Sequence, residues 1–363
     1  MNALISFKKK WRTIQISFCI ISIFFLSMVP SFAIESKPEG ITGFTYSILF
    51  PDNQIDKELG YYHLKMTPGQ QQQLAIVLTN TSNEKIKVDV KVNGAKTNQN
   101  GIIEYGESDI KNDASLNSDF KDLVKAPESV ELAPKETKKL ELTVKMPRTS
   151  YDGVIAGGIQ LMRSGQTEAK KNNNGSKIIN QYAYVVGMVL QETDVAVVPD
   201  LALNSIKVGQ TNYSSSIFVN FSNVKSSYLN NMTVDVKITK PGEEKVLYEH
   251  NQTDMRMAPN SFIDFPINLG GKSISSGNYE ADILVTSEGK KWTWRESFKV
   301  TDEESNIVNK KNIEVVSKKG LPWKAILFLI VACLVIGLSL YFFLQFFKKN
   351  KQKKKVLQKR KNK

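Results

Sequence analysis

Histidine and cysteine, the side chains that most often carry catalysis or bind a metal, are scarce in this chain. The 363 residues include two histidines, His63 and His250, and two cysteines, Cys19 and Cys333. The sequence has no HExxH zinc motif and no GxSxG nucleophile motif. A pair of carboxylates flanking a glycosidic bond is the enzymatic arrangement that the sequence leaves open. We therefore expect a protein that is not an enzyme and needs no metal or other cofactor.

One group of residues has the composition of a sugar-binding site. Tyr151, Asp152 and Gly153 are consecutive, and Gly157 and Gly158 follow shortly after. A tyrosine ring can stack on a sugar while the neighbouring acid bonds its hydroxyls, and the glycines allow close approach of a backbone or a flat ligand. Ordinary turn chemistry favours the alternative, a hairpin turn with a packed tyrosine.

Two aromatic pairs are further candidates for binding. Tyr61 and Tyr62 are adjacent, so an extended chain directs them to opposite faces and one of them belongs to the core. Trp292 and Trp294 share one face with Phe298, which favours core packing. The alternative for the tryptophans is an exposed aromatic pair on an edge strand, where a partner would bind.

The elements that position these residues are strands, because apolar and polar residues alternate along most of the chain. The clearest alternating stretches are 74–79, 86–93, 140–146, 217–222, 232–239 and 279–285. Such half-buried strands, separated by turns and not by helices, predict an all-β ectodomain of two tandem Ig-like β-sandwiches. One short helix is expected around 118–124.

Composition suggests where these sandwiches begin and end. We predict a first sandwich over 42–164 and a second over 177–301. Between them, 165–176 is polar and contains glycine, which is typical of a linker or long loop. The polar and charged stretch 302–322 is expected to form a stalk.

The two ends of the chain carry its long apolar segments. Residues 1–33 combine a basic start, an apolar stretch and small residues at a cleavage position, as a signal peptide does; an uncleaved anchor helix is the alternative. Within the predicted transmembrane helix 323–347, 20 consecutive residues lack charge, enough to cross a bilayer. The basic tail 348–363 indicates a cytoplasmic end, so the single-pass protein would be type I and mostly extracellular.

The charge of the chain follows from these ends. The sequence has 49 basic and 36 acidic residues, but the signal peptide and the segment from Trp323 onward contain fifteen of the basic ones. The extracellular part is therefore nearly neutral, which argues against nucleic acid as a partner. That part also lacks cysteine, and a surface domain without disulfides fits a bacterium with one membrane.

The order of several short motifs resembles the WxL-interacting protein family of Gram-positive cell surfaces. These motifs are Phe44-Thr45-Tyr46, Gly60-Tyr61-Tyr62, Pro68-Gly69, Asn80-Thr81, Tyr151-Asp152-Gly153, Gly157-Gly158 and Pro199-Asp200-Leu201. The apolar helix and the basic tail complete the layout. No single motif is strongly specific, and their order over almost the whole mature chain carries the resemblance.

The resemblance implies a peptidoglycan-binding first domain and a host-binding second domain. The implied partners are peptidoglycan, WxL-domain surface proteins and host extracellular matrix or serum proteins, with the membrane held through the C-terminal helix. The expected function is adhesion or scaffolding at the cell wall. An accessory component of a complex for polysaccharide capture or degradation is the alternative. A signalling receptor would need a partner, because the 16-residue tail is too short to fold.

Overall fold

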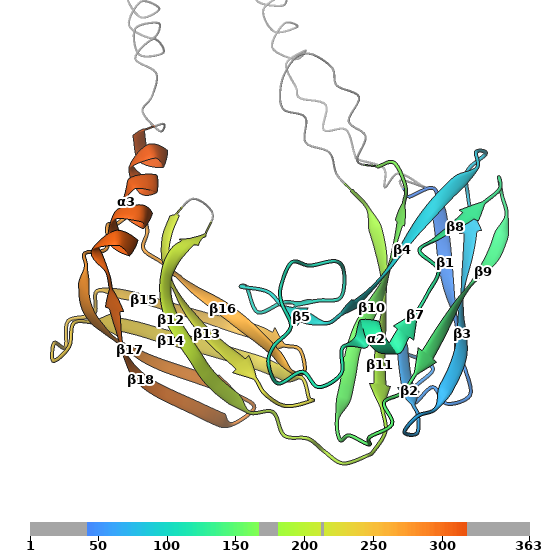
Figure 1. Ribbon diagram of the computed structural model, residues 1–363, viewed down its shortest axis with the longest axis horizontal. Coiled ribbons are helices and arrows are strands. Elements are labelled where there is room, and N and C mark those ends of the chain that lie inside the picture. Colours follow the sequence, from blue (N-terminus) through green and yellow to red (C-terminus); the bar gives the residue numbers. More distant parts are fainter. Residues whose placement is uncertain (1–41, 167–180, 212–213, 318–363) are drawn as a thin grey trace, which may run out of the picture.

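The computed structural model describes residues 42–166, 181–211 and 214–317, with side chains as far as residue 310. Two β-sandwiches stand side by side, and the segment that carries β5 (Lys96–Thr97) lies between them (Figure 1). The predicted signal peptide 1–33, transmembrane helix 323–347 and basic tail 348–363 lie outside the described residues. No helix within the described ranges is long and apolar enough to span a bilayer.

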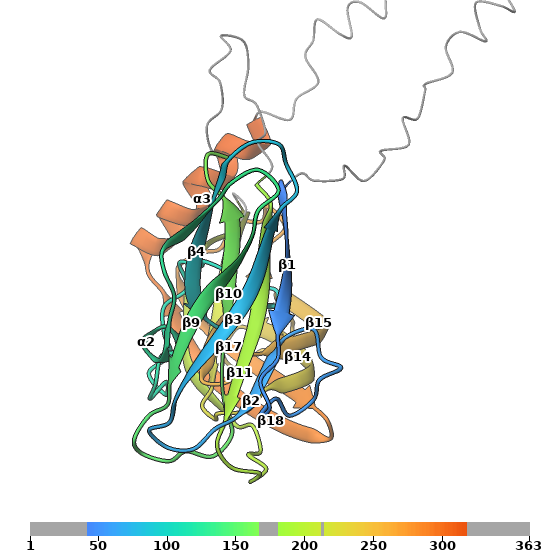
Figure 2. The ribbon, with the colours of Figure 1, turned by 90° about the vertical axis from the view of Figure 1, so that its right-hand side faces the viewer.

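The first sandwich consists of a four-stranded and a five-stranded sheet. The four-stranded sheet has the order β1 (Phe44–Leu49), β3 (Gln71–Asn80), β9 (Thr137–Lys145), β7 (Val124–Lys125). The five-stranded sheet has the order β2 (Tyr62–Lys65), β11 (Ala183–Gln191), β10 (Val154–Arg163), β4 (Ile86–Gly94), β8 (Ser129–Leu132). Figure 2, in which this sandwich faces the viewer, shows the long strands running alongside one another.

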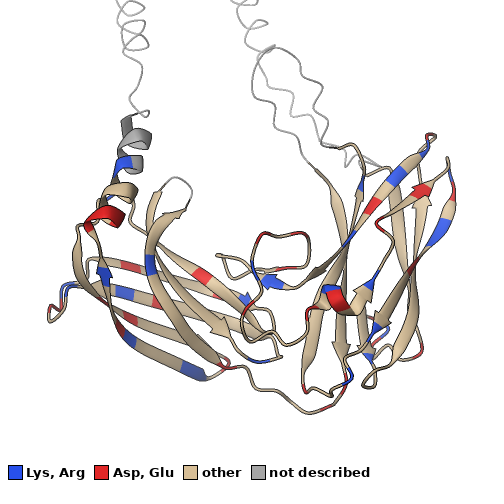
Figure 3. Ribbon diagram, viewed as in Figure 1, with Lys and Arg blue, Asp and Glu red and all other residues tan. Residues whose placement is uncertain are grey.

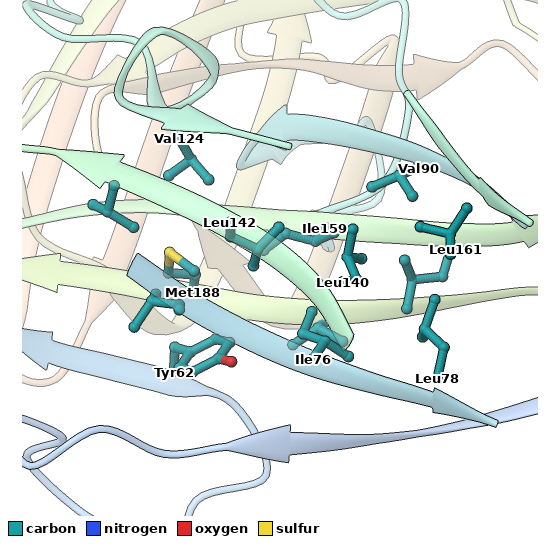
Figure 4. Packing of buried hydrophobic residues seen from close by; sticks show 14 of the residues in the cluster. Tyr62, Ile76, Leu78, Val90, Val124, Leu140, Leu142, Ile159, Leu161 and Met188 are labelled. Carbon is teal, nitrogen blue, oxygen red and sulfur yellow. The ribbon is translucent and has the colours of Figure 1, made fainter. Parts of the chain in front are cut away.

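Alternation of apolar residues produces the core between these sheets. Ile76 of β3 and Leu140 of β9 meet Ile159 of β10 and Met188 of β11 in the interior (Figure 4). Each such side chain is buried and contributes about 1.5–3 kcal/mol relative to exposure. Tyr62 is also fully buried, and its hydroxyl donates to the carbonyl of Ala75 at 2.8 Å, which confirms that one of the adjacent tyrosines belongs to the core.

The second sandwich consists of a three-stranded and a four-stranded sheet around its own core. The first has the order β12 (Leu201–Thr211), β13 (Ser214–Asn223), β16 (Ser261–Asn268). The second has the order β15 (Tyr248–Met257), β14 (Leu229–Thr239), β17 (Gly277–Ser287), β18 (Lys290–Val300). Glu288 and Gly289 join β17 to β18 with φ of 47° and 85°, the geometry that favours a two-residue hairpin.

The predicted structural boundary at 165–176 is corrected by strand pairing. β11 pairs antiparallel with β10 from Val154 opposite Gln191 to Met162 opposite Ala183, so it completes the first sandwich. The polar stretch therefore falls between two strands of one hairpin, and residues 192–200 connect the sandwiches. A long polar hairpin loop and a domain linker have the same local composition, and only the distant pairing of β11 separates them.

The predicted stalk begins as a helix, α3 (Asp302–Ser317), that packs on the second sandwich. The Thr301 hydroxyl accepts from the Glu304 N–H at 3.2 Å, and the Glu304 carboxylate accepts from the Thr301 N–H at 2.8 Å, forming a capping box. Val308 is buried in the second core, and Asn309 bonds both backbone groups of Ile274. Apolar and polar side chains on one face of the segment thus hold it to the domain.

Candidate binding groove at the domain junction

An inserted segment of the first sandwich makes most of the contact with the second. We call residues 95–119 the arm; it carries β5 and β6 (Ile103–Glu104) and leads into the short helix α2 (Phe120–Leu123), close to the helix predicted at 118–124. Thr97 in the arm is buried, and its hydroxyl accepts from the Ala258 N–H at 3.0 Å and lies 2.7 Å from the Ser261 hydroxyl. Because these groups are shielded from water, their pairing stabilises the docked arm.

Further along, the arm fits the second sandwich closely. Gly101 has φ of 68°, and a Cβ there would lie 2.5 Å from the Met255 side chain. The Gly101 carbonyl accepts from the Arg256 N–H at 2.7 Å. Asn260 donates to the Ser115 carbonyl at 3.0 Å. The two sandwiches are therefore joined by backbone and side-chain bonds in addition to the connecting segment.

The predicted turn Tyr151-Asp152-Gly153 lies at this junction, and its tyrosine is packed. The Tyr151 hydroxyl donates to the Leu190 carbonyl at 2.8 Å, and burial followed by the charge of Glu192 raises the pKa of Tyr151. The Asp152 carbonyl accepts from the Ser226 hydroxyl at 2.5 Å. Gly153 has φ of 88°, and a Cβ there would lie 2.1 Å from the Ser226 carbonyl oxygen. The turn thus contacts the second sandwich; whether it binds a ligand stays a prediction.

The two glycines of β10 serve opposite faces of the sheet. A Cβ on Gly157 would lie 2.1 Å from the ring of Phe120, which α2 inserts into the core. A Cβ on Gly158 would lie 2.6 Å from the carbonyl oxygen of Tyr105 in the arm. The close approach expected of these glycines is made by the protein's own arm and α2.

The tryptophans of β18 are half-buried against the second core, although β18 is an edge strand. Trp294 stacks on Phe221 with the ring centroids 6.3 Å apart. Trp292 donates its indole N–H to the Asp200 carboxylate at 2.9 Å and so fixes the end of the connecting segment. Core packing therefore accounts for both rings, and a binding role for them stays a prediction.

A groove of about 560 Å³ opens where the arm, the first sandwich and the second sandwich meet. We call it the tyrosine groove; its principal lining residues are Tyr61, Tyr105, Val185, Gly187, Tyr228 and Arg256. The volume falls within the range of roughly 300–1,000 Å³ that small-molecule sites occupy. Tyr62 is buried, whereas the adjacent Tyr61 is 37% exposed and faces this groove.

Two glycines that face each other across the sheet let Tyr61 and Tyr105 approach the strands beside the groove. Gly158 of β10 lies opposite Gly187 of β11. A Cβ on Gly187 would lie 3.4 Å from the Cβ of Tyr61, and a Cβ on Gly158 would lie 2.9 Å from that of Tyr105. The missing side chains let both tyrosines lie close to the strands.

The polar groups of the groove are tyrosine hydroxyls and one guanidinium. The hydroxyls of Tyr105 and Tyr228 are 3.2 Å apart. Burial, and next the interaction with Tyr105, raises the pKa of Tyr228, so its hydroxyl stays protonated at physiological pH. The Arg256 guanidinium lies 5.9 Å from the Tyr228 ring centroid and donates to the Asn230 amide oxygen at 2.9 Å. Arg256 makes no ion pair with any carboxylate of the described residues.

Of the residues that line the groove, sequence reasoning singled out Tyr61 but missed Tyr105, Tyr228 and Arg256. These three come from the arm and from the second sandwich, and no local motif marks them. Within the described part of the chain, no three His, Asp or Glu side chains gather as metal ligands would.

Comparison with solved structures finds distant matches. The chain is similar to the class 5 fimbriae chaperone CfaA at 13% identity, covering 71% of this chain and 99% of that one with a TM-score of 0.26. It is similar to the PapD-like domain 7 of human CEP192 at 14% identity, covering 43% and 88% with a TM-score of 0.24. At these TM-scores the likeness carries no inference about function. No curated protein matches the chain.

Two family models match consecutive parts of the chain. The WxL Interacting Protein peptidoglycan binding domain matches 44–163, and the WxL Interacting Protein host binding domain matches 173–310. The border between the matches falls in the predicted linker, so the second match includes β11 of the first sandwich. Both models describe binding domains and not enzymes, which indicates a cell-surface binding role. The chain belongs to the WxL-interacting protein family.

Proposed function

We propose that this protein is a non-enzymatic adhesion or scaffold protein that binds peptidoglycan, WxL-domain surface proteins and host extracellular matrix or serum proteins. One observation carries the proposal: a peptidoglycan-binding and a host-binding family model match consecutive regions that the arm joins. A joined pair of modules can hold the wall and a protein partner in fixed relative positions, because the buried hydrogen bonds of Thr97 oppose separation.

The surface charges favour recognition through defined sites. Lys and Arg are interspersed with Asp and Glu over both sandwiches (Figure 3). A mixed surface produces no strong long-range field of one sign. Binding would therefore depend on shaped features such as grooves and strand edges, and salt would weaken it less than it weakens binding to a basic surface.

The proposed location is the outer face of a Gram-positive cell membrane. Residues 1–33 would direct export and be removed, 323–347 would anchor the chain, and 348–363 would remain in the cytoplasm. Protease added to intact cells would then degrade residues 42–317. Complete protection of these residues in intact cells, with digestion after lysis, would contradict the proposed location.

Sedimentation with purified peptidoglycan tests the binding function. The full-length chain, purified in detergent, is expected to pellet with peptidoglycan and to capture a WxL-domain protein in the same assay. Pelleting that is unaffected by prior digestion of the peptidoglycan would show non-specific association. A chain that stays in the supernatant would contradict the proposal.

A further inference from the structure

The shape of the tyrosine groove suits a flat ring. Gly187 lines the groove together with Tyr61 and Tyr105, and Tyr105 covers Gly158 next to it. The exposed part of Tyr61 offers an aromatic face that is anchored on the protein side by Gly187. Aromatic faces of this kind pack against the apolar face of a ring while the hydroxyl at the ring edge remains available for hydrogen bonds.

The polar groups of the groove suit a ligand that combines hydroxyls with an anion. Tyr105 and Tyr228 present hydroxyls, which both donate and accept. Arg256 is exposed at the groove and lacks a described carboxylate partner, although guanidinium pairs strongly with carboxylates. None of the described residues that line the groove is acidic, so nothing there repels an anion.

We infer that the tyrosine groove binds a carboxylate-bearing amino-sugar unit of peptidoglycan, an inference that rests on the proposed function. The sugar ring packs against the exposed face of Tyr61. The hydroxyls of Tyr105 and Tyr228 bond the hydroxyl and acetamido groups of the sugar. Arg256 pairs with a carboxylate of the attached stem peptide. A ligand of this class offers a ring and an anion together.

The groove is complete only when both sandwiches are docked. The first sandwich and its arm provide Tyr61, Tyr105 and Gly187, whereas the second sandwich provides Tyr228 and Arg256. The region matched by the host binding model thus contributes side chains to a peptidoglycan site. Docking through Thr97 and Ser115 therefore sets the width of the site.

The test measures binding of soluble fragments to the full-length chain by calorimetry. The main probe is a peptidoglycan disaccharide that carries a dipeptide with free carboxylates. Three comparison probes are the same fragment with amidated carboxylates, the dipeptide alone, and a neutral amino-sugar oligomer. The main probe is expected to bind most tightly, and the dipeptide alone most weakly.

Two variants change the groove without touching either core, because Tyr61 and Arg256 are exposed. Arg256→Gln is expected to weaken binding of the main probe by about 10- to 100-fold and to leave binding of the amidated fragment unchanged. Tyr61→Ala is expected to weaken binding of both fragments by about tenfold. Tyr182→Ala and Arg148→Gln replace comparably exposed residues outside the groove and serve as matched controls.

The outcomes separate this inference from the proposed function. Pelleting of the wild-type chain with peptidoglycan, together with variants that bind all probes like wild type, would overturn the inference and leave the function standing. Equal binding of the dipeptide alone and the main probe would also overturn it, since it would show a peptide site. Failure of the wild-type chain to pellet would overturn both.

Discussion

The two sandwiches share a strand order and differ in what is inserted into it. β1-β3-β9 of the first corresponds to β12-β13-β16 of the second, and β11-β10-β4-β8 corresponds to β18-β17-β14-β15. The first sandwich adds β2 at one edge, and between β4 and β8 it adds the arm, α2 and β7. The shared strands form the two cores, whereas the added arm forms the junction and the tyrosine groove.

A buried asparagine at the end of a strand occurs in both sandwiches. Asn80 ends β3 and donates to the carbonyls of Glu84 and Ala133, both at 2.8 Å. Asn223 ends β13 and donates to the carbonyls of Ser227 at 2.7 Å and Ala258 at 3.1 Å. In each case the alanine precedes a proline and then a residue of positive φ, Lys135 or Asn260. In both sandwiches, therefore, a buried asparagine joins the turn that follows its own strand to a distant Ala-Pro turn, and we call this arrangement the asparagine corner.

Adjacent glycines in a central strand distinguish the first sandwich from the second. β10 carries adjacent glycines because Phe120 and the arm press on its two faces, whereas β17, its counterpart, has no glycine from Asn278 to Ser287. The comparison indicates that the asparagine corner is part of the fold common to both sandwiches. The glycines of β10 instead accompany the arm and α2, which the first sandwich adds. Substitutions can test this separation.

Gly157→Ala is expected to cause the largest loss, about 3 kcal/mol of unfolding free energy. The new Cβ would overlap the Phe120 ring and lie 2.5 Å from the backbone oxygen of Asn93. Urea unfolding of the full-length chain measures the effect. Gly60→Ala is the control, because nothing lies within 4 Å of its Cβ position. A wild-type midpoint for Gly157→Ala would show that α2 does not pack there.

Asn80→Ala and Asn223→Ala are each expected to lose about 2 kcal/mol, since buried carbonyls lose their donor. Similar losses in the two sandwiches would support the shared corner. Hydrogen exchange of the adjacent turns reports which sandwich loosens. The exposed Asn83→Ala should change neither. A loss at one corner alone would break the correspondence between the two domains.

Thr97→Val removes the arm's buried hydroxyl and is expected to cost about 1–2 kcal/mol of docking. Hydrogen exchange should rise in the arm and around Ala258 while the sheets stay protected. Thr137→Val removes an exposed hydroxyl pair with Thr79 and should have little effect. Faster exchange throughout both cores would mean that the arm is part of a single folding unit.

The cap of α2 predicts the smallest effect, one that depends on pH. Burial raises the pKa of Asp119, but hydrogen bonds from Asn112 and the Lys121 N–H, with the Lys121 charge, outweigh it and hold that pKa below its usual value. A lowered pKa stabilises the fold above the ordinary Asp range and loses this contribution as pH falls through the folded value. Asp119→Asn should therefore unfold at a lower urea concentration than wild type at pH 6. A difference that persists at pH 2 would contradict this assignment.

Alternation in the sequence predicted the individual strands well. Leu74, Ile76 and Leu78 face the first core as expected, and Ile217 and Val219 face the second. A period of two depends on the local chain, so one sequence suffices to detect it. Alternation also predicted that one of the two adjacent tyrosines is buried, and the structure identifies it as Tyr62.

Long-range contacts account for what the sequence did not predict. The strand at 183–191 was assigned to the wrong sandwich, because its partner β10 lies beyond a polar stretch. The docked face of α3 has few apolar residues, and its anchors are Val308 and Asn309. Tyr228 and Arg256 reach the groove from another domain, so no spacing in the chain relates them to Tyr61.

The most direct test of the central claim measures the affinity of the full-length chain for purified peptidoglycan. The account predicts saturable binding that soluble carboxylate-bearing disaccharide fragments compete away and that Thr97→Val weakens. Peptidoglycan that retains none of the chain at any concentration would contradict the account.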